Sequence, residues 1–292
     1  MESKKDIYDL IPAEFYPPTL FFKASTTVEN ILKDIKQNGL NFPIVGKPDI
    51  GMKGIMVKKL ETENDLQQYT SKSKVNFLVQ KFVPYKNEIG IFYFRYPNKE
   101  KGQISGIVKK EFLAVTGDGV STIEQLILKN KRAVLQMPTL RKAAKDKMNT
   151  VLRKDEELIL VPYGNHVRGA KFLDDSRLID EELTTTIDSI CKKINGFYFG
   201  RLDIRYNTWE ELKKGKNFSI IELNGSGSEP THIYDPKHSI FWAWKEIIRH
   251  LNILYRISKL NHQLQKTPYM TTSMGLDMFK QNSEHLKLLN SN

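Results

Sequence analysis

Cysteine is nearly absent from this chain of 292 residues, in which Cys191 stands alone. A lone cysteine excludes a disulfide framework within the chain and a cysteine-rich zinc site, and it is typical of a reducing compartment. Long hydrophobic runs are also missing: no stretch of about 18 uncharged apolar residues occurs, and the charged segment MESKKDIYDL has no signal-peptide core. These absences predict a cytoplasmic protein that neither crosses a membrane nor is secreted.

No repeat of fixed period and no low-complexity linker divides the chain. Hydrophobic residues make up 40% of it and charged residues 27%, as in ordinary globular proteins, so neither general disorder nor a fibrous architecture is expected. At roughly 150 residues per domain, the length predicts two compact lobes with buried cores.

Acidic residues are too few to balance the basic ones. The chain has 45 lysines and arginines against 34 aspartates and glutamates, a formal charge of +11. Such an excess attracts anions, and nucleic acid, an acidic membrane surface and a nucleotide triphosphate all qualify. A basic surface that serves only solubility explains the charge equally well, so charge alone does not name the partner.

Helical and extended patterns alternate along the chain, which predicts a mixed α and β fold. Residues 42–46 form an apolar strand pattern, followed by a turn with Gly51 and Gly54 and by a second short strand from Ile55 to Val57. Further strands are predicted at 76–82, 88–96, 103–110, 197–206 and 218–223. Helices are predicted at 61–69, after Ser121 and at 179–194, and the polar stretch 208–217 is predicted to be a solvent-facing connection.

One long amphipathic helix is predicted near the C-terminus. From His238 to about Leu260, apolar residues recur every three or four positions, as on one face of a helix. The helix is basic and carries Trp242 and Trp244, so it could make peripheral contact with a membrane, but packing against the core is the simpler explanation. After Gln265 the sequence is polar, and at most partial order is expected.

Two predicted neighbouring strands, in LDIRY and IIELNG, carry polar side chains among apolar residues. Glu222 and Asn224 are two residues apart, so on a strand both side chains point to the same face. Together with Asp203 they offer the hard oxygen ligands that suit magnesium. An ion pair with Arg201 or Arg205 would also offset the cost of a carboxylate within a strand. Spacing alone leaves a magnesium site and a structural ion pair both open.

KPDIGMKG, residues 47–54, places a lysine at a strand end before a loop with two glycines. Backbone N–H groups of such a loop and the Lys47 ammonium can approach phosphate oxygens. The segment lacks the Gly-Lys-Ser/Thr ending of a Walker sequence. A glycine-bearing hairpin with a solvated lysine is the alternative.

Two other segments have compositions suited to ligands. Residues 77–94 join two strands by a polar link, whose free peptide groups could hydrogen-bond a purine edge while Glu88 holds ribose hydroxyls; an ordinary edge hairpin is the alternative. GNHVRGAKF gathers His166, Arg168 and Lys171 around glycines. This composition suits an anionic substrate better than a core.

The order of these segments resembles the ATP-grasp superfamily, specifically the carboxylate-amine ligase branch that includes D-alanine:D-alanine ligase, the RimK-type glutamate ligases and cyanophycin synthetase. The resemblance covers about residues 1–236 and rests on KPDIGMKG, VQKFVPYKNE, KKEFLAVTGDGVSTIEQLI, NHVRG, and GRLDIRY followed by IELNGSGSEPTHIYDP. It implies two α+β lobes whose antiparallel or mixed sheets enclose ATP, plus a long C-terminal helix. The implied division is a remnant of a preceding domain at 1–40, a small lobe at 41–95, a large lobe at 96–236, and a C-terminal helix and tail at 237–292.

The resemblance also implies roles for individual residues. Asp203, Glu222 and Asn224 match the family's magnesium ligands. Lys4 and Lys47 match lysines that contact the phosphates, and Gly51, Lys53 and Gly54 match the flap over them. Gln80, Lys81, Phe82 and Val83 match the hinge that binds adenine. Glu88 matches the acid that binds the ribose. The positions that match catalytic residues are Arg201, which stabilises the oxyanion, the RimK-type loop residue Arg168, and the basic residue Lys110.

The implied activity is that of a ligase dependent on ATP and magnesium, with two ions expected and manganese as a substitute. A substrate carboxylate attacks the γ-phosphorus to give an acyl phosphate and ADP, and an amine then displaces phosphate. The partners would be carboxylate and amine substrates, small molecules or peptides, and no nucleic acid. The alternatives are an ATP-grasp kinase that phosphorylates a hydroxyl, and a non-catalytic basic protein that binds nucleic acid or a membrane.

One segment departs from the family pattern. EPTHIYDP replaces the proline-glycine ending typical of D-alanine:D-alanine ligases, so dipeptide formation from D-alanine is not expected. His232, Tyr234 and Asp235 either contact the amine acceptor or form a simple turn.

Overall fold

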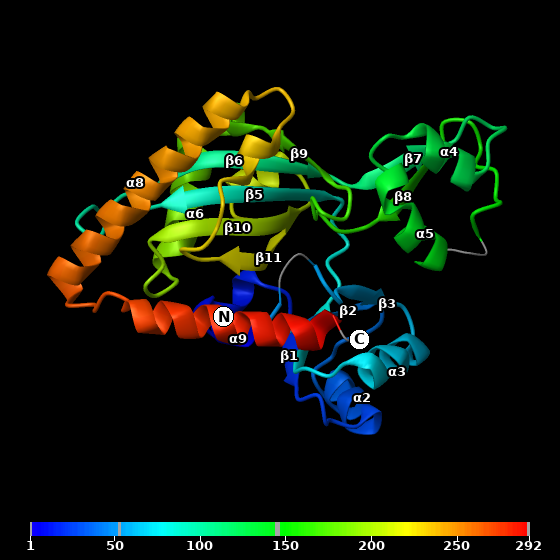
Figure 1. Ribbon diagram of the computed structural model, residues 1–292, viewed down its shortest axis with the longest axis horizontal. Helices are drawn as coiled ribbons and strands as arrows, with labels where there is room; N and C mark the ends of the chain where they lie inside the picture. Colours follow the sequence, from blue (N-terminus) through cyan, green and yellow to red (C-terminus); the bar gives the residue numbers. More distant parts are fainter. Residues whose placement is uncertain (1, 52–53, 144–146, 291–292) are drawn as a thin grey trace.

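The computed structural model describes residues 2–51, 54–143 and 147–290. Two antiparallel sheets form the frame of an α+β fold (Figure 1). The smaller sheet has the order β1-β4-β2-β3. Its strands are β1 at Thr19–Phe22, β2 at Ile44–Pro48, β3 at Lys58–Leu60 and β4 at Phe77–Lys81. Helices α2 (Val28–Gln37) and α3 (Glu63–Lys72) pack on this sheet, and their buried residues Ile31 and Leu66 share a core with Ile44.

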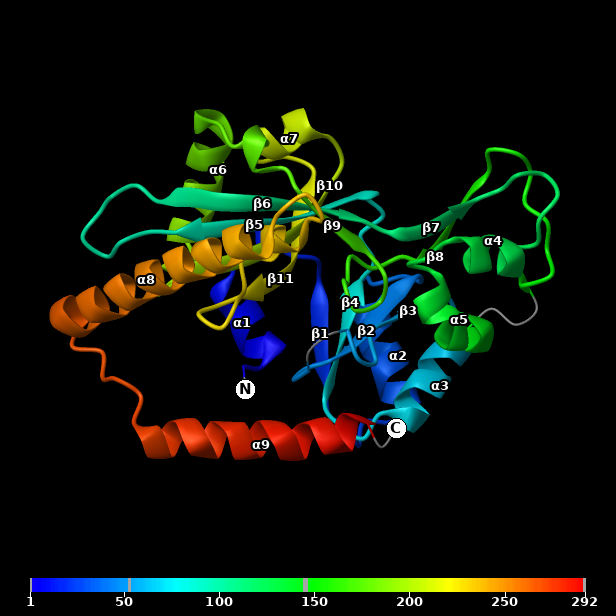
Figure 2. The same cartoon turned by 45° about the horizontal axis from the view of Figure 1, so that its top comes forward.

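The larger sheet has the order β11-β10-β5-β6-β9. Its strands are β5 at Asn87–Phe94, β6 at Gln103–Glu111, β9 at Lys171–Asp174, β10 at Phe199–Tyr206 and β11 at Phe218–Asn224. Alternate residues of β5 face opposite sides of the sheet, as the pleat requires. Ile91 packs in the core formed with α6 (Glu181–Lys192), while Phe92 packs in the core formed with α8 (Ile240–Gln265). Helices α6 and α8 therefore cover opposite faces (Figure 2).

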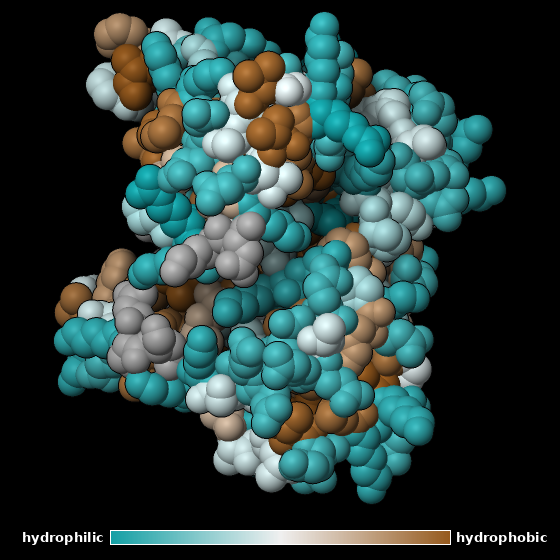
Figure 3. Space-filling view, turned by 90° about the vertical axis from the view of Figure 1, so that its right-hand side faces the viewer, coloured by the Kyte–Doolittle hydropathy of each residue, from teal (hydrophilic) through white to brown (hydrophobic). Residues whose placement is uncertain are grey.

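A smaller unit projects from the larger sheet. It consists of the hairpin β7 (Leu113–Thr116) and β8 (Glu157–Val161) with helices α4 (Ile123–Lys129) and α5 (Met137–Ala143), around a core of their own. The helix predicted after Ser121 is α4. The side of the molecule that bears this unit is mostly hydrophilic, with hydrophobic side chains in separate groups (Figure 3).

Short helical segments complete the chain. They are α1 (Lys4–Leu10), α7 (Trp209–Lys213) and the 3-10 turns at Ala13–Phe15, Val134–Gln136, Ser176–Leu178 and Thr231–Tyr234. The stretch 208–217, predicted to be a connection, thus contains a helix. Thr208 and Glu211 cap α7 reciprocally, which favours helix over coil even in so polar a segment.

The C-terminal region is more helical than predicted. The long helix α8 is confirmed, but residues beyond Gln265, where partial order was expected, include a second helix, α9 (Thr272–Asn290). Helix α9 runs back past α1 toward the smaller sheet (Figure 1). His285 of α9 hydrogen-bonds the Ile50 carbonyl at 2.9 Å, so contact with a distant loop fixes a segment whose own pattern is weak. Among the described residues, no helix has both the length and the hydropathy needed to cross a bilayer.

Strand pairing groups the chain differently from the predicted ranges. β1, from the range 1–40, pairs with β4 in the smaller sheet, and β5, from the range 41–95, pairs with β10 in the larger one. Residues Ile55 and Met56 lie in a turn instead of a strand, and Met56 has φ 57°, a left-handed backbone. These differences arise from long-range pairing and from a turn, which a local apolar pattern does not reveal.

The core of the larger sheet should dominate stability. Ile91 is fully buried in the cluster that joins the sheet to α6. Replacing Ile91 by Ala removes these contacts and leaves a cavity, so the free energy of unfolding is expected to fall by about 2–5 kcal/mol, as urea denaturation would measure. The control is Ile159→Ala on β8, where a side chain 43% exposed should cost under about 0.5 kcal/mol. Equal losses in the two variants would contradict the placement of the core.

Candidate active site

A cleft of about 630 Å³ lies between the two sheets. Every described residue to which the resemblance assigns a role borders it, from Lys4 to Asn224. Its charged residues are Lys4, Lys47, Lys81, Lys110, Arg168, Arg201 and Arg205 on the basic side and Glu88, Asp203, Glu222 and Glu229 on the acidic side. Seven cations against four carboxylates make the cleft a favourable site for a polyanion.

Strand alternation explains why these side chains meet. Arg201, Asp203 and Arg205 are two apart on β10 and therefore share one face of the sheet. In the registers with the neighbouring strands, Asp203 lies opposite Glu222 of β11 and Arg205 opposite Glu88 of β5. The same face is aromatic where α8 covers it and charged where it faces the cleft.

Two carboxylates and three cations form a buried network on this face. The Asp203 carboxylate accepts hydrogen bonds from Arg201 Nε at 2.8 Å and pairs with Lys110 Nζ at 3.0 Å. Glu88 pairs with Lys110 Nζ at 3.2 Å and with Arg205 Nε at 3.2 Å. Burial acts to raise the pKa of Asp203, but Arg201 and Lys110 outweigh it and hold the pKa at about 2. Asp203 therefore stays ionised at neutral pH.

Gly90 of β5 leaves room for this network. A Cβ atom at Gly90 would lie 3.0 Å from Asp203 Oδ1, 3.0 Å from Arg201 Cδ and 2.8 Å from Val108 Cγ1. Any side chain at this position would therefore force the Val108, Arg201 or Asp203 side chain to shift.

Two lysines approach the cleft from the other side. Lys47 ends β2, and its Nζ donates to Tyr8 Oη at 2.7 Å, to Gln80 Oε1 at 2.9 Å and to the Ile221 carbonyl at 3.3 Å. Lys4 donates from Nζ to the Gly51 carbonyl at 3.0 Å. Burial lowers the pKa of Lys4, and the Glu222 charge opposes this shift.

The segment predicted to bind adenine, Gln80–Val83, leaves β4 and lines the cleft. The Gln80 side chain is used internally, because its Oε1 accepts from Lys47 and its Nε2 donates to Thr19 Oγ1 at 2.7 Å. The Val83 carbonyl accepts from Arg205 Nη1 at 3.1 Å. Lys59 Nζ lies 4.5 Å from the centre of the Phe82 ring.

Two loops from opposite halves meet over the cleft. A Cβ atom at Gly54 would lie 2.9 Å from Asn165 Nδ2, which places the glycine loop against the NHVRG loop. Arg168 Nη1 donates to the Val57 carbonyl at 3.2 Å, and its guanidinium stacks 5.3 Å from the Tyr163 ring centre. Lys53, predicted to belong to the flap, lies outside the described residues.

Comparison with known proteins identifies the fold of the chain. No model of a known protein family and no curated protein sequence matches the chain. The D-alanine-D-alanine ligase of Coxiella burnetii superposes on 90% of the chain with a TM-score of 0.50 and 11% identity. The carboxyaminoimidazole ribonucleotide synthase of Aspergillus clavatus, solved with ATP, superposes on 87% with a TM-score of 0.50 and 9% identity. The chain has the ATP-grasp fold.

A further match is the bifunctional glutathione synthetase of Pasteurella multocida, with 15% identity over 89% of the chain and a TM-score of 0.44. The chain spans 58% of the length of the Coxiella ligase, 51% of the Aspergillus synthase and 36% of the Pasteurella protein. The predicted ATP-grasp fold is thus confirmed at the level of architecture, while the residue roles implied by the resemblance stay predictions.

The predicted magnesium ligands of this ATP-grasp fold differ in how free they are. No hydrogen bond to the Glu222 carboxylate is found within residues 2–51, 54–143 and 147–290, and Asn224 Nδ2 is buried without a hydrogen-bond partner there. Both side chains line the cleft, and hard oxygen donors of this kind suit Mg²⁺. Asp203 is already paired with two cations, so it would share its oxygens with Arg201 and Lys110. Within the described part of the chain, no group of three or more His, Cys, Asp or Glu side chains is placed to hold a metal ion, so the magnesium site stays a prediction that rests on Glu222, Asn224 and the shared Asp203.

Two residues that hold side chains of this ATP-grasp cleft in place were missed as site residues by sequence reasoning. Arg205 holds Glu88 and the Val83 and Pro162 carbonyls, and its spacing of two from Asp203 could have revealed it. Tyr8 accepts from Lys47 and donates to the Ile221 carbonyl, a role that no local signal in α1 indicates.

The segment EPTHIYDP was predicted either to contact the amine acceptor or to form a simple turn, and only part of it borders the cleft. Tyr234 lines the cleft, but His232 and Asp235 are buried away from it. His232 bonds Glu246 of α8 at 3.1 Å, and Asp235 accepts from the Asp174 backbone N–H at 2.7 Å. These two residues hold a turn. Thr231 also borders the cleft, and its buried hydroxyl has no hydrogen-bond partner among the described residues.

The affinity of the cleft for a polyanion should depend on pH through Lys47. Burial lowers the pKa of Lys47 to about 8, although the Glu222 charge opposes the shift, whereas burial raises the pKa of the neighbouring Tyr8 and keeps it neutral. Lys47 loses its charge as pH rises through 8, so affinity for an ATP analogue is expected to fall between about pH 7 and 9. The variant Lys47→Arg stays charged throughout and should show a flat profile in calorimetric titrations.

The lowered pKa of Lys47 also makes the free energy of unfolding depend on pH. The pKa of Lys47 in the folded protein lies below its ordinary value of 10.5, so the cost of burying its charge is present below about pH 8 and is relieved as pH rises. Equal pH profiles of nucleotide affinity in the wild type and in Lys47→Arg would contradict this role for Lys47.

Proposed function

We propose that the chain is an ATP- and magnesium-dependent ligase that activates a carboxylate as an acyl phosphate and couples it to an amine. The observation that carries the proposal is the cationic cleft between two sheets of an ATP-grasp fold, with Asp203 and Glu222 paired across neighbouring strands. The two most similar structures described above are an amino acid ligase and a synthase solved with ATP.

The chain's own residues would perform the reaction mainly by positioning and charge. Lys4 and Lys47 would hold the phosphates from one side of the cleft, and Arg201 from the other. Mg²⁺, when bound by Asp203, Glu222 and Asn224, supplies neutralisation of the β- and γ-phosphate oxygens. The arginine would then face the negative charge that develops on the acyl carbon's oxygen when the amine adds. Such chemistry requires no nucleophilic serine or cysteine, and Cys191 is buried in α6 away from the cleft.

The test is a screen for release of ADP and phosphate with panels of carboxylates and amines, followed by hydroxylamine trapping. A ligase gives a hydroxamate in the absence of amine, because hydroxylamine captures the acyl phosphate. ADP release that requires a hydroxyl compound and yields no hydroxamate would favour the kinase alternative. No ADP release with any carboxylate and amine pair would count against the ligase.

A second candidate function is contact with an anionic membrane surface through α8. The outward side of this helix exposes large apolar residues at spacings of three and four, namely Phe241, Trp244, Ile248, Leu251 and Tyr255. Glu246 is the one acidic residue of α8, and it is paired with His232 and Arg249. The other charged residues of the helix are basic. Apolar and basic side chains together suit a bilayer with anionic lipids.

Cosedimentation with vesicles measures this contact. Binding to phosphatidylglycerol vesicles but not to phosphatidylcholine vesicles is expected, and Ile248→Glu should abolish it. Leu128→Glu on α4, at a similarly exposed apolar position, serves as the control and should bind like the wild type. Equal binding by the wild type and Ile248→Glu would exclude α8 as the contact.

A further inference from the structure

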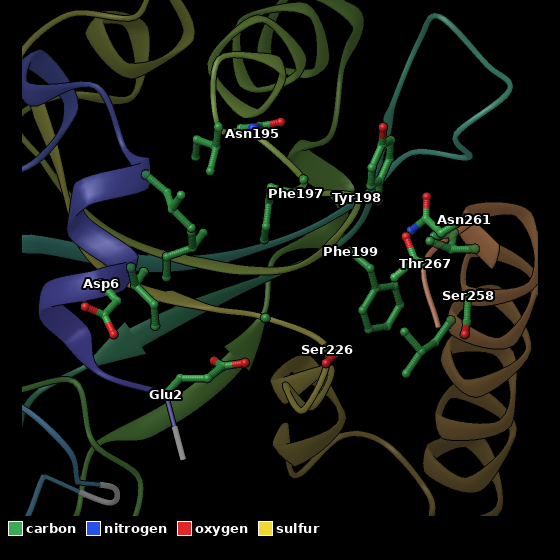
Figure 4. Close-up of a pocket in the computed structure, with 18 of the residues that line it drawn as sticks. Glu2, Asp6, Asn195, Phe197, Tyr198, Phe199, Ser226, Ser258, Asn261 and Thr267 are labelled. Atoms are coloured by element: carbon green, nitrogen blue, oxygen red, sulfur yellow. The ribbon is translucent and has the colours of Figure 1, made fainter. Parts of the chain in front are cut away.

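A second cavity lies at the end of the larger sheet, beyond the cleft. Its volume is about 580 Å³, and it is enclosed by α1, the turn before β10, the end of β11 and the C-terminal half of α8. Figure 4 shows Glu2, which precedes α1, and Asp6 of α1 on one side of it and Ser258 and Asn261 of α8 on the other, with Phe197 and Phe199 between them.

The cavity and the cleft share a wall. Asn224 lines the cleft, whereas its neighbours Leu223 and Gly225 line the cavity. Likewise, Lys4 lines the cleft and Ser3 lines the cavity. Asn224 pairs in register with Arg201, at the end of β10 remote from Arg205 and the predicted adenine segment. Four residues of strand separate these ends, or about 13 Å. The cavity thus adjoins the end of the cleft where the proposed acyl transfer takes place.

The charges of the two spaces are opposite. The cleft is lined by an excess of cations, but none of the described residues that line the cavity is a lysine, arginine or histidine. Its carboxylates are Glu2 and Asp6, in a chain whose formal charge is +11. A Cβ atom at Gly225 would lie 3.6 Å from Glu2 Oε1, so one of these carboxylates lies beside the shared wall.

The rest of the lining combines apolar and uncharged polar side chains. Its walls include Ile7, Leu10, Leu254 and Ile257. Asn261 Oδ1 is buried without a hydrogen-bond partner among the described residues, and leaving a buried acceptor unpaired is unfavourable. A ligand with a hydrogen-bond donor would relieve that cost.

From this contrast we infer that the cavity binds the amine acceptor, and that this acceptor is a primary amine carrying an apolar group. The inference rests on the proposed ligase function for its catalytic part. The carboxylates attract the ammonium group toward the shared wall, and the apolar walls hold the hydrocarbon part. After losing a proton, the amine nitrogen attacks the acyl phosphate carbon, a C–N bond forms, the C–O bond to phosphate breaks, and inorganic phosphate leaves with a further proton released from nitrogen.

Direct binding tests the cavity without any assumption about catalysis. The probes are n-octylamine, n-octanol and octanoate, titrated into the full chain by calorimetry. Octylamine is expected to bind more tightly than octanol, and octanoate not at all. Octanoate binding as tight as octylamine binding would overturn the inference, because the carboxylates would then have no effect.

Matched variants locate the binding. Ser258→Trp fills the cavity and should abolish octylamine binding, whereas Lys259→Trp, one residue further along α8 and outside the cavity lining, should leave it unchanged. Asp6→Asn should weaken binding about two- to fivefold, because an exposed charge contributes modestly. Asp9→Asn on the same helix lies outside the lining and should have no effect. Unchanged octylamine binding in Ser258→Trp would overturn the inference.

The outcomes separate this inference from the proposed ligase function. Once a substrate pair is known, Ser258→Trp should raise the KM for the amine while hydroxamate formation without amine stays at the wild-type rate. Equal loss of hydroxamate formation would place the defect in the cleft and overturn the assignment of the amine to the cavity. If no pair releases ADP yet octylamine binds and Ser258→Trp abolishes its binding, the ligase proposal fails while the amine cavity stands.

Discussion

Replacing Arg201 by Met is expected to slow ADP-forming acyl transfer by about 10²–10³-fold, the usual effect of removing one preorganised group that faces developing negative charge. Arg201 is held by Asp203 at 2.8 Å and by the Glu229 carbonyl at 3.2 Å, so its guanidinium is fixed in the cleft before substrate arrives. Burial acts to lower the pKa of Arg201, but Asp203 and Glu222 outweigh it, so the group remains charged.

Single-turnover kinetics with the substrate pair measures this effect. Arg177→Met is the matched control, because its side chain is 83% exposed and pairs only with Asp175 among the described residues. Arg177→Met should react at the wild-type rate. A loss below about threefold in Arg201→Met would mean that the arginine only supports the fold of Asp203.

Replacing Glu222 by Gln should raise the concentration of magnesium that nucleotide binding requires. The carboxylate lies opposite Asp203 and has no hydrogen bond from the described residues, so it is available to a cation. Its charge also acts on Lys4 and Lys47, whose ammonium groups it favours. The amide has a similar shape but no charge. We therefore expect the concentration of Mg²⁺ needed for half-maximal binding of an ATP analogue to rise at least tenfold, which corresponds to a loss of about 1.4 kcal/mol of binding free energy.

Titration of Mg²⁺ at a fixed concentration of the analogue provides the measurement. Glu210→Gln on α7 is the control, since that carboxylate lies outside the cleft lining. An unchanged Mg²⁺ requirement in Glu222→Gln would remove Glu222 from the proposed ligand set.

Sequence reasoning reached those parts of the site that rest on local rules. The two-residue spacing of Glu222 and Asn224 and the strand propensity around Asp203 follow from the chain itself, and the strands β10 and β11 are paired as neighbours. The long helix near the C-terminus also follows from its apolar spacing, and it is α8. The order of segments, matched to a family, supplied the ATP-grasp fold.

Other features depend on contacts between distant segments. Tyr8 reaches Lys47 across 39 positions of sequence, and β1 joins β4 across about 55. The helix α9 is held by Leu289, which is buried near Gly51, and by His285. Neither the hydrophobic periodicity nor the helix-capping residues of these segments predict such contacts. The charge contrast between the cleft and the adjoining cavity likewise appears only when the chain is folded.

The central claim, that the cleft between the sheets binds ATP with magnesium, is tested most directly by thermal unfolding with a non-hydrolysable ATP analogue. The account predicts a rise in melting temperature that requires both the analogue and Mg²⁺, corresponding to about 2.7 kcal/mol at a hundred times the dissociation constant. It also predicts that Glu222→Gln loses most of this rise. An identical melting temperature with and without the analogue, at millimolar concentrations of both ligands, would contradict the account.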